Sequence, residues 1–456
     1  MMMKKMLKPG IRVKRYIFLA LASIITMAVA IAKLIDERHV TTIHDKAVFI
    51  ILIIFSGLVG YKSIVWCVKS VVSLVNKGYI NLSIEEDDLE DLIEDDRLLI
   101  KGPKIVVIGG GTGLSTMLRG LKHYTSNVTA IVTVGDDGGG SGILREDLGI
   151  LPPGDIRNCI LALANTEPLM NELLQYRFND GRLKGQSFGN LFLAAMDGIS
   201  ENFEDAVQKM SSVLAVKGEV LPVTLENMVL EAELMNGHRV RGESLIGEEV
   251  IDQSSPIKKL KIIPEDAKAL DRALEAIEEA DAIVLGPGSL YTSVLPNLLV
   301  KDISKAIKKS KAFKIYNCNI MTQPGETDGF KVSDHVQVIL DHCGKDMVDC
   351  IIANSKDISE ELKEKYLDKN SELVELDINK LKKMGLCVVD GDLTKVKGDY
   401  IRHNSDYLAQ LLIETVMEKH LLYDRKKILE YIYLSQRIKK REGSNRKEQS
   451  CHFQQK

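Results

Sequence analysis

The sequence lacks paired cysteine motifs and a large excess of charge of either sign. Its 7 cysteines are scattered, and no two have the Cys-x-x-Cys spacing of a zinc or thiol-redox site. Their odd number favours a reducing, cytosolic setting for the main domain. A formal net charge of -4 gives no overall attraction to nucleic acid. With 456 residues, the chain is long enough for one large or two ordinary globular domains.

The charged residues are concentrated in runs near the two ends of the chain. An acidic run from Glu85 to Asp96 and a basic run from Arg437 to Lys447 are typical of solvated linkers and tails. We therefore predict a basic N-terminus at 1–15, an acidic linker at 77–101 and a basic C-terminal tail at 426–456.

Two long apolar runs, Tyr16–Ala32 and Ala47–Tyr61, precede the acidic linker. Each is close to the about 20 apolar residues of a membrane span, so we predict a two-helix transmembrane hairpin at 16–76. A cleaved signal peptide is the alternative, but no cleavage site follows and a second apolar run comes at once. Because basic residues flank the hairpin, both ends are expected in the cytoplasm, with a domain at 102–425 anchored to the cell membrane.

The rest of the chain has the pattern of an α/β fold. Continuous apolar runs predict strands at Lys104–Gly109, Val128–Gly135, Ala280–Gly286 and Ala312–Asn319, and helical spacing predicts a helix over Pro264–Ala280. Such alternation favours a mostly parallel sheet with helices on both faces. Ligands of such sheets bind beyond the carboxyl ends of the strands.

The loop Gly109–Gly113 follows the first predicted strand and opens a helix, an arrangement that suits an anion. Leu114 breaks the dinucleotide fingerprint, and the P-loop pattern is also missing. A tight structural turn remains the alternative. After the second strand, Asp136 and Asp137 precede several glycines. They are candidates for binding sugar hydroxyls or a divalent cation, or for acting as a base; an acidic turn is the alternative.

Further motifs follow other predicted elements. Asp155 is predicted to cap a helix, with Arg157 and Asn158 in its first turn, where they can reach a phosphate. The segment Gly185–Gly189 matches a nucleophile elbow, but the polar segment before it disfavours a serine hydrolase. The loop Gly286–Ser289 again follows a strand and opens a helix that contains Tyr291 and Thr292, and Asn317 ends another strand.

Six motifs occur in order between Lys104 and Leu412: "GGGTG", "DDGGGSG", "PPGDIRNC", "SFGN", "GPGSLYTS" and "MTQPGET". Together they resemble the gluconeogenesis factor (YvcK-type) family, within the CofD-like superfamily of 2-phospho-L-lactate transferase. The resemblance implies a Rossmann-like fold that binds UDP-sugars, notably UDP-N-acetylglucosamine, and a role in cell shape and wall synthesis during gluconeogenic growth. It implies that the two glycine loops hold the diphosphate and nucleotide, and that Asp136 and Asp137 face the sugar. The expected ligand-binding residues are Gly109, Gly110, Gly111, Thr112, Gly113, Asp136, Asp137, Arg157, Asn158, Gly189, Asn190, Gly286, Gly288, Ser289, Tyr291, Thr292 and Asn317.

Two positions depart from the pattern expected for the family. Gln186 stands where a histidine is expected, and Ile143 where a basic residue is expected. Both favour binding over catalysis. We therefore expect a regulator that needs no cofactor and is sensed by a wall-synthesis partner, with homo-oligomerisation left open. The alternatives are a transferase that holds a divalent metal at Asp136 and Asp137 and, less favoured because of the broken fingerprint, an NAD-dependent oxidoreductase.

Overall fold

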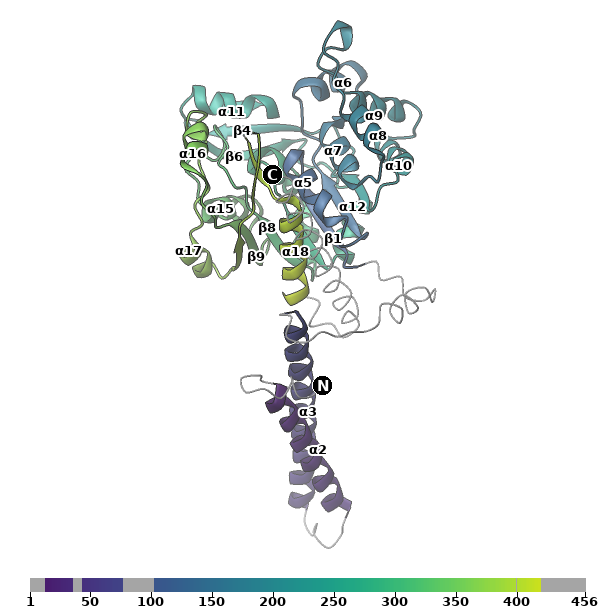
Figure 1. Cartoon of the computed structure of the whole chain (residues 1–456), viewed down its shortest axis with the longest axis vertical. Coiled ribbons are helices and arrows are strands. Elements are labelled where there is room, and N and C mark those ends of the chain that lie inside the picture. The colour runs from purple at the N-terminus through teal and green to yellow at the C-terminus, as the bar shows by residue number, and fades with distance from the viewer. Residues whose placement is uncertain (1–12, 36–42, 77–101, 399, 420–456) are drawn as a thin grey trace, which may run out of the picture. The chain divides into compact units, whose positions relative to one another are not determined.

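The computed structural model describes residues 13–35, 43–76, 102–398 and 400–419 (Figure 1). The chain divides into two compact units, Met1–Ile100 and Lys101–Lys456. The predicted acidic linker at 77–101 and the predicted basic tail at 426–456 lie outside the described residues.

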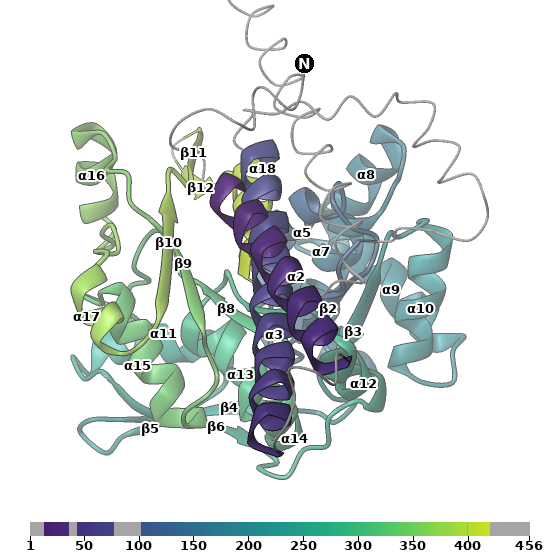
Figure 2. The same ribbon diagram turned by 90° about the horizontal axis from the view of Figure 1, so that it is seen from below.

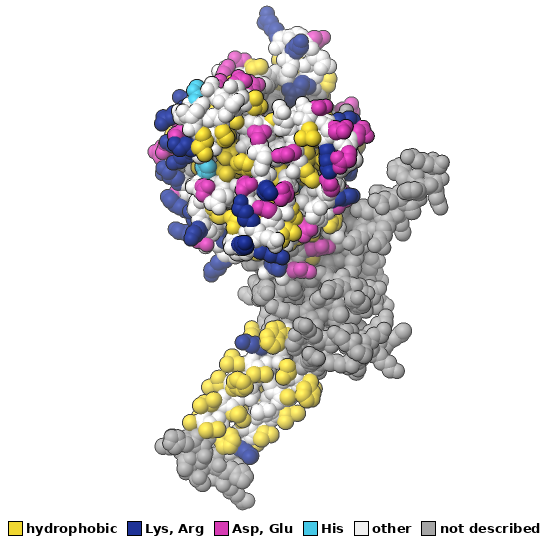
Figure 3. All heavy atoms as spheres, turned by 90° about the vertical axis from the view of Figure 1, so that its left-hand side faces the viewer, with side chains coloured by type: hydrophobic (Ala, Val, Ile, Leu, Met, Phe, Trp, Pro, Cys, Tyr) yellow, Lys and Arg dark blue, Asp and Glu magenta, His cyan; other side chains and the backbone are white. Residues whose placement is uncertain are grey.

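The first unit is a pair of helices, α2 (Val13–Ile35) and α3 (Ile43–Asn76). A Cβ built on Gly60 would lie 2.7 Å from Ser23 Oγ, so glycine permits the helices to approach closely there. Apolar side chains such as Phe18 and Phe55 are exposed, and Figure 3 shows hydrophobic side chains over much of this unit. The prediction of two helices is confirmed.

The predicted membrane-spanning character of these helices is not supported. Among the residues that the structure describes, neither helix is both long enough and apolar enough to cross a membrane. The uncharged run Tyr16–Ala32 falls short of the about 20 apolar residues that a span needs, and Lys62 interrupts the apolar run of α3. The structure therefore does not support the prediction of a transmembrane hairpin at 16–76 or the predicted anchoring to the membrane.

Seven parallel strands form the central sheet of the second unit. They are β1 (Ile105–Gly109), β2 (Val128–Val132), β3 (Glu219–Pro222), β7 (Ala282–Leu285), β8 (Phe313–Asn317), β9 (Cys350–Asn354) and β10 (Cys387–Gly391). Their order is β10-β9-β8-β7-β1-β2-β3, and Figure 2 shows the sheet extending from β10 to β3. The four strands predicted from the sequence are confirmed.

The central strands are apolar along their whole length because helices flank the sheet. Every residue of β1, β7 and β9 is buried, which is why they appear in the sequence as continuous apolar runs. Helices α5 (Gly111–Leu121) and α7 (Pro153–Leu163) pack on each other, as do α12 (Asp271–Glu279) and α14 (Lys301–Lys309). Figure 3 shows acidic and basic side chains intermixed over the visible surface of this unit.

The predicted helix over Pro264–Ala280 is shorter than expected, because α12 begins only at Asp271. Leu270 has extended dihedral angles, and its N–H donates to the carbonyl oxygen of Val223 at 3.1 Å. A tertiary hydrogen bond therefore holds the residue before the helix outside it.

The remaining elements surround the sheet. A three-stranded antiparallel sheet has the order β5-β4-β6, from β4 (Val229–Leu234), β5 (Arg239–Arg241) and β6 (Ile257–Ile263), and β11 (Thr394–Lys397) pairs with β12 (Tyr400–His403). The other helices are α6 (Gly139–Leu148), α8 (Pro168–Gln175), η1 (Gly181–Leu183), α9 (Phe188–Gly198), α10 (Phe203–Val213), α11 (Glu243–Asp252), the π-helix η2 (Leu290–Val294), α13 (Leu295–Leu299), α15 (Val332–Cys343), α16 (Glu360–Leu367), α17 (Ile378–Lys383) and α18 (Ser405–Lys419).

The strand order reverses direction between β1 and β7. The chain adds β2 and β3 on one side of β1, and later adds β7, β8, β9 and β10 on the other side. The loops after β1 and β7 therefore start from neighbouring strand ends at this reversal, the position at which open α/β sheets bind ligands.

Candidate functional site

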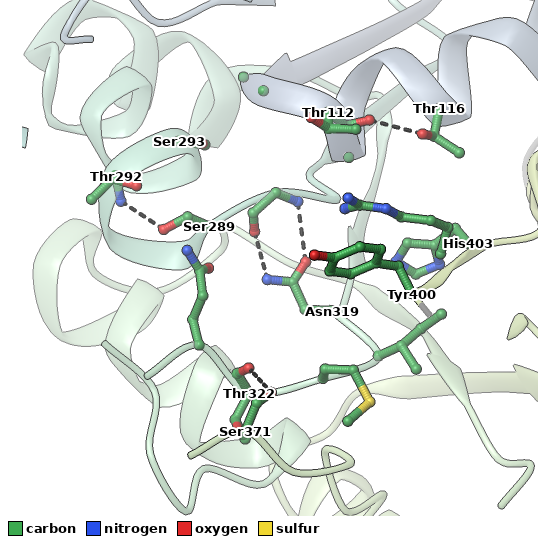
Figure 4. A pocket seen from close by; sticks show the side chains of 18 of the residues that line it. Thr112, Thr116, Ser289, Thr292, Ser293, Asn319, Thr322, Ser371, Tyr400 and His403 are labelled. Atoms are coloured by element: carbon green, nitrogen blue, oxygen red, sulfur yellow. Dashed lines mark hydrogen bonds between the residues drawn. The ribbon is translucent and has the colours of Figure 1, made fainter. Parts of the chain in front are cut away.

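A cavity of about 570 Å³ opens beyond the carboxyl ends of β1 and β7. Its lining residues are Gly110–Gly113, Thr116, Thr133, Asp136, Asp155, Glu243, Gly288, Ser289, Thr292, Ser293, Asn319–Gln323, Tyr366, Ser371 and Tyr400–His403. Figure 4 shows hydroxyl, amide and aromatic side chains from several elements around it. Eight of the residues expected from the sequence therefore share one cavity: the run Gly110–Gly113 with Asp136, Gly288, Ser289 and Thr292.

The turn from β1 into α5 forms one wall of the cavity. Gly111 has a φ of 68°, a left-handed conformation that glycine adopts without strain. A Cβ on Gly113 would lie 2.8 Å from the carbonyl oxygen of Pro287, so glycine is needed where this turn touches the loop after β7. Gly110 precedes α5 and has no side chain to cap it. The first turn of α5 can therefore offer backbone N–H groups to an anion.

The loop after β7 is held in place by hydrogen bonds. Asn319 Oδ1 accepts from the N–H of Gly288 at 3.1 Å, and Asn319 Nδ2 donates to the Gly288 carbonyl at 2.8 Å (Figure 4). Ser289 Oγ accepts from the N–H of Thr292 at 3.1 Å and donates to Glu326. These hydrogen bonds hold the loop to Asn319 and Glu326.

Three carboxyl groups around the cavity have raised pKa values. Burial, and then the charge of Asp136, raise the pKa of Asp155 to about 7. Burial, and then the charge of Asp136, also raise the pKa of Glu243 to about 7. Burial raises the pKa of Glu326 to about 7, against the opposing hydrogen bond from Ser289. Near neutral pH these groups are partly protonated, which lets Asp155 and Glu243, the two that line the cavity, donate hydrogen bonds to oxygen atoms of a ligand.

Asp155 does not cap α7, so that prediction was wrong. The residue before the helix is Pro152, and no side chain caps it. Asp155 instead accepts a hydrogen bond from the N–H of Gly111. A Cβ on Gly110 would lie 2.5 Å from Asp155 Oδ2, so the carboxyl lies directly against the glycine turn.

Asp136 and Asp137 do not act as a pair. Asp136 lines the cavity, and its Oδ1 accepts from the N–H of Gly138 at 2.9 Å. Asp137 Oδ2 accepts from the N–H of Glu243 at 3.0 Å, and Oδ1 accepts from the N–H of Ser244 at 2.9 Å. Asp137 therefore caps α11. Over the part of the chain that the structure describes, no group of three or more His, Cys, Asp or Glu residues is placed to hold a metal ion.

The far wall of the cavity comes from residues that the sequence analysis missed. Tyr366 belongs to α16, and Tyr400, Arg402 and His403 belong to β12. The guanidinium carbon of Arg402 lies 5.6 Å from the centre of the Tyr400 ring. Burial lowers the pKa of His403 to about 4, so its ring is neutral at physiological pH. The only signal in the sequence is the "YIRH" segment itself, which matches no loop motif and lies far along the chain from the glycine turns.

Other expected residues support the loops without lining the cavity. Gly109 ends β1 and Gly286 follows β7. Asn317 ends β8 and is buried, with neither side-chain polar atom in a hydrogen bond. The ring of Tyr291 packs edge-on against His342 at 6.4 Å between ring centres.

Four expected residues lie on α7 and α9, outside the lining of the cavity: Arg157, Asn158, Gly189 and Asn190. Ser187 accepts from the N–H of Asn190 at 3.2 Å and caps α9, which explains the serine of the elbow-like segment structurally. Gln186, next to it, is buried, whereas Ile143 on α6 is exposed.

The chain is similar to proteins of one family over most of its length. A family model described as 2-phospho-L-lactate transferase CofD matches residues 105–394. A relative from Clostridium acetobutylicum, named "Putative gluconeogenesis factor", is 61% identical over 433 residues, which are 95% of this chain and 96% of that protein. The gluconeogenesis factor of Bacillus subtilis is 49% identical over 317 residues, 69% of this chain and 99% of that protein.

A solved structure shares the fold. The crystal structure of a UPF0052 family member from Bacillus halodurans aligns with a TM-score of 0.66 and 48% sequence identity. The alignment covers 68% of this chain and 99% of that one. At this identity, the similarity extends to sequence as well as to fold.

Proposed function

Because the chain belongs to the gluconeogenesis factor family, we propose that it binds a UDP-sugar, UDP-N-acetylglucosamine, and acts as a regulator without converting it. In this proposal the bound state is sensed by a protein partner and supports cell shape and wall synthesis when carbon arrives through gluconeogenesis. The family model of 2-phospho-L-lactate transferase CofD, which matches residues 105–394, relates the chain to that transferase only distantly.

The contact between the two glycine loops is the observation that carries the proposal. A Cβ on Gly288 would lie 3.1 Å from the carbonyl oxygen of Gly110, and a Cβ on Gly113 would lie 2.8 Å from that of Pro287. This contact places the start of α5 at the reversal of the strand order, the position and charge that suit a diphosphate. The cavity volume of about 570 Å³ is within the range of small-molecule sites.

For each part of the nucleotide sugar, the cavity has lining residues of suitable chemistry. We assign the diphosphate to the first turn of α5, because backbone N–H groups bind anions without a metal. The aromatic rings of Tyr366 and Tyr400 suit the face of the base, and Arg402 suits a phosphate. The carboxyl groups of Asp136 and Glu243 suit the hydroxyl groups of a hexose.

Replacing Gly111 tests the cradle, with Gly149 as a matched control. Gly111 and Gly149 have φ values of 68° and 69°, so alanine strains the backbone equally at both positions. Gly111 lines the cavity, whereas Gly149 ends α6 with open space around it. We expect Gly111→Ala to weaken UDP-N-acetylglucosamine binding at least about tenfold, and Gly149→Ala to leave it within about twofold. Equal affinities of the two variants, measured by calorimetry, would refute the assignment of the cradle.

A transferase is the second candidate, and the carboxyl groups of Asp136 and Asp155 favour it. Both line the cavity, and the charge of Asp136 contributes to the raised pKa of Asp155. Two carboxylates at a phosphate site are ligands that suit a divalent cation. Incubation of UDP-N-acetylglucosamine with the protein and Mg²⁺, followed by chromatography, separates the two functions: release of UDP or UMP would favour the transferase.

A further inference from the structure

Glu326 lies in the segment "MTQPGET", which the proposed function leaves without a role. Ser289 Oγ donates a hydrogen bond to Glu326 Oε2, and Gln323 Nε2 donates to Oε1 at 3.0 Å. The backbone N–H of Tyr291 donates to the same carboxyl group. Three donors therefore converge on one carboxyl group beside the loop that follows β7.

This carboxyl group acts on the nucleotide-sugar cavity through its neighbours. Ser289 and Gln323 line that cavity, whereas Glu326 borders a separate cavity of about 410 Å³. Figure 4 shows Ser289 among the polar side chains of the first cavity. Ser289 follows Gly288, whose Cβ would lie 3.1 Å from the carbonyl oxygen of Gly110. Glu326 is thus connected through Ser289 to the contact between the two glycine loops.

The hydroxyl group of Ser289 is fully engaged within the protein. Its oxygen accepts from the N–H of Thr292 at 3.1 Å, and its hydrogen is donated to Glu326. A hydroxyl group has one hydrogen and two acceptor lone pairs. While Glu326 is ionised, Ser289 therefore has no hydrogen to offer a ligand. A protonated Glu326 can instead donate to the second lone pair of Ser289 Oγ, which frees the hydrogen of Ser289.

The groups that face Glu326 favour its protonated form. Burial raises the pKa of Glu326 to about 7, against the hydrogen bonds from Ser289 and Tyr291, and the charge of Asp328 raises it further. The charge of Glu326 in turn raises the pKa values of Glu243 and Tyr291. The surrounding titratable groups are thus acidic. A bound diphosphate adds more negative charge, which favours the neutral carboxyl group.

We propose that Glu326 is a positioning residue that takes up a proton when the nucleotide sugar binds, and thereby turns the hydroxyl group of Ser289 into a donor to the diphosphate. The carboxylate gains one proton from the solvent, its O–H donates to Ser289 Oγ, and the O–H of Ser289 donates to a phosphate oxygen. The inference rests on the proposed function and deepens it, because it adds a proton to the binding reaction. Affinity then falls as the pH rises through about 7, where the competent form of Glu326 becomes the minor one.

Calorimetry of the full chain with UDP-N-acetylglucosamine at pH 6 and pH 8 tests this proton link. Glu326→Gln keeps the shape of the side chain and carries an amide that can donate to Ser289 Oγ at either pH. Because Asp155 and Glu243 also titrate near pH 7, the decisive quantity is the affinity of Glu326→Gln relative to wild type. We expect this ratio to rise about tenfold from pH 6 to pH 8. Glu278→Gln, at an exposed position on α12, is the matched control, and its ratio should stay within about twofold. A ratio for Glu326→Gln that does not change with pH would overturn the inference.

The same titrations in two buffers of different ionisation enthalpy count the protons that are taken up. At pH 8, wild type should take up more protons per ligand than Glu326→Gln, by a difference that approaches about one. Equal proton uptake by the two proteins would show that Glu326 is not the group that titrates on binding.

A second variant keeps the inference testable if Glu326→Gln fails to fold. Ser289→Ala removes the hydroxyl group but leaves the carboxyl group in place. We expect it to bind about tenfold more weakly than wild type at pH 6 and within about twofold of wild type at pH 8, where protonating Glu326 offsets the gained hydrogen bond. A loss of affinity that is the same at both pH values would mean an ordinary hydrogen bond with no proton link, against the inference.

Inorganic pyrophosphate, as a second probe, separates this inference from the proposed function. If UDP-N-acetylglucosamine does not bind, but pyrophosphate binds with proton uptake that Glu326→Gln lowers, only the proposed ligand is wrong. If UDP-N-acetylglucosamine binds with equal proton uptake in wild type and Glu326→Gln, only the inference is wrong. Binding of neither probe at either pH would refute both.

Discussion

At the scale of single residues, the acids around the cavity keep their protons to higher pH than ordinary carboxyl groups do. The pKa of Asp155 rises from 3.8 to about 7, and that of Glu243 from 4.5 to about 7. The folded protein then binds more protons than the unfolded chain between about pH 4 and pH 7. The free energy of unfolding therefore falls as the pH rises through this window, and changes little from this source above it.

Asp155→Asn should remove the share of this pH dependence that comes from Asp155. Asparagine keeps an oxygen acceptor for the N–H of Gly111 but cannot ionise. We expect denaturant unfolding between pH 5 and pH 7 to show a shallower fall in stability for the variant, by at most about 1.4 kcal/mol per pH unit. Parallel curves for wild type and variant would show that Asp155 has an ordinary pKa.

The roles of the glycines in the turns could be predicted well from the sequence, and the roles of the aspartates less well. Gly111 and Gly113 could be identified because positive φ values and backbone contacts admit little else. Asp155 has the spacing of a capping residue, and only the tertiary position of Gly111 shows its actual partner. Asp136 and Asp137 look equivalent in sequence, but α11, more than a hundred residues later, takes the second one as its cap.

At the scale of elements, Asp137 joins the loop after β2 to the start of α11. Asp137→Ala removes the acceptor for two backbone N–H groups. We expect the free energy of unfolding to fall by about 1–2 kcal/mol, as for other lost helix caps. UDP-N-acetylglucosamine affinity should change less than about twofold, because the side chain does not line the cavity.

Asp147→Ala replaces an exposed aspartate on α6 and is the control. It should leave the free energy of unfolding within about 0.5 kcal/mol of the wild-type value. A large loss of ligand affinity in Asp137→Ala, with stability unchanged, would instead place Asp137 in the ligand site.

Elements with strong local patterns were predictable, and those defined by long-range contacts were not. The buried strands β1, β2, β7 and β8 follow from continuous apolar runs. The start of α12 did not, because the hydrogen bond from Leu270 to Val223 excludes the preceding segment from the helix. The wall formed by α16 and β12 depends on where the chain runs after β9 and again after β10, which no local pattern specifies.

At the scale of the whole molecule, the reversal of strand order explains why motifs far apart in sequence share one cavity. β1 and β7 are neighbours in the sheet although their loops are more than 170 residues apart. The sequence predicted the fold class because its apolar strands and motifs are local and strong. The prediction of a membrane hairpin was wrong, because an apolar run with a flanking lysine differs little in composition from a membrane-spanning helix.

The most direct test of the account is a calorimetric titration of the full chain with UDP-N-acetylglucosamine, followed by recovery of the ligand. We predict saturable binding in about the micromolar range without added metal, with the nucleotide sugar recovered intact. Recovery of UDP, or binding only with a divalent cation and a second substrate, would contradict a regulator and make the protein an enzyme.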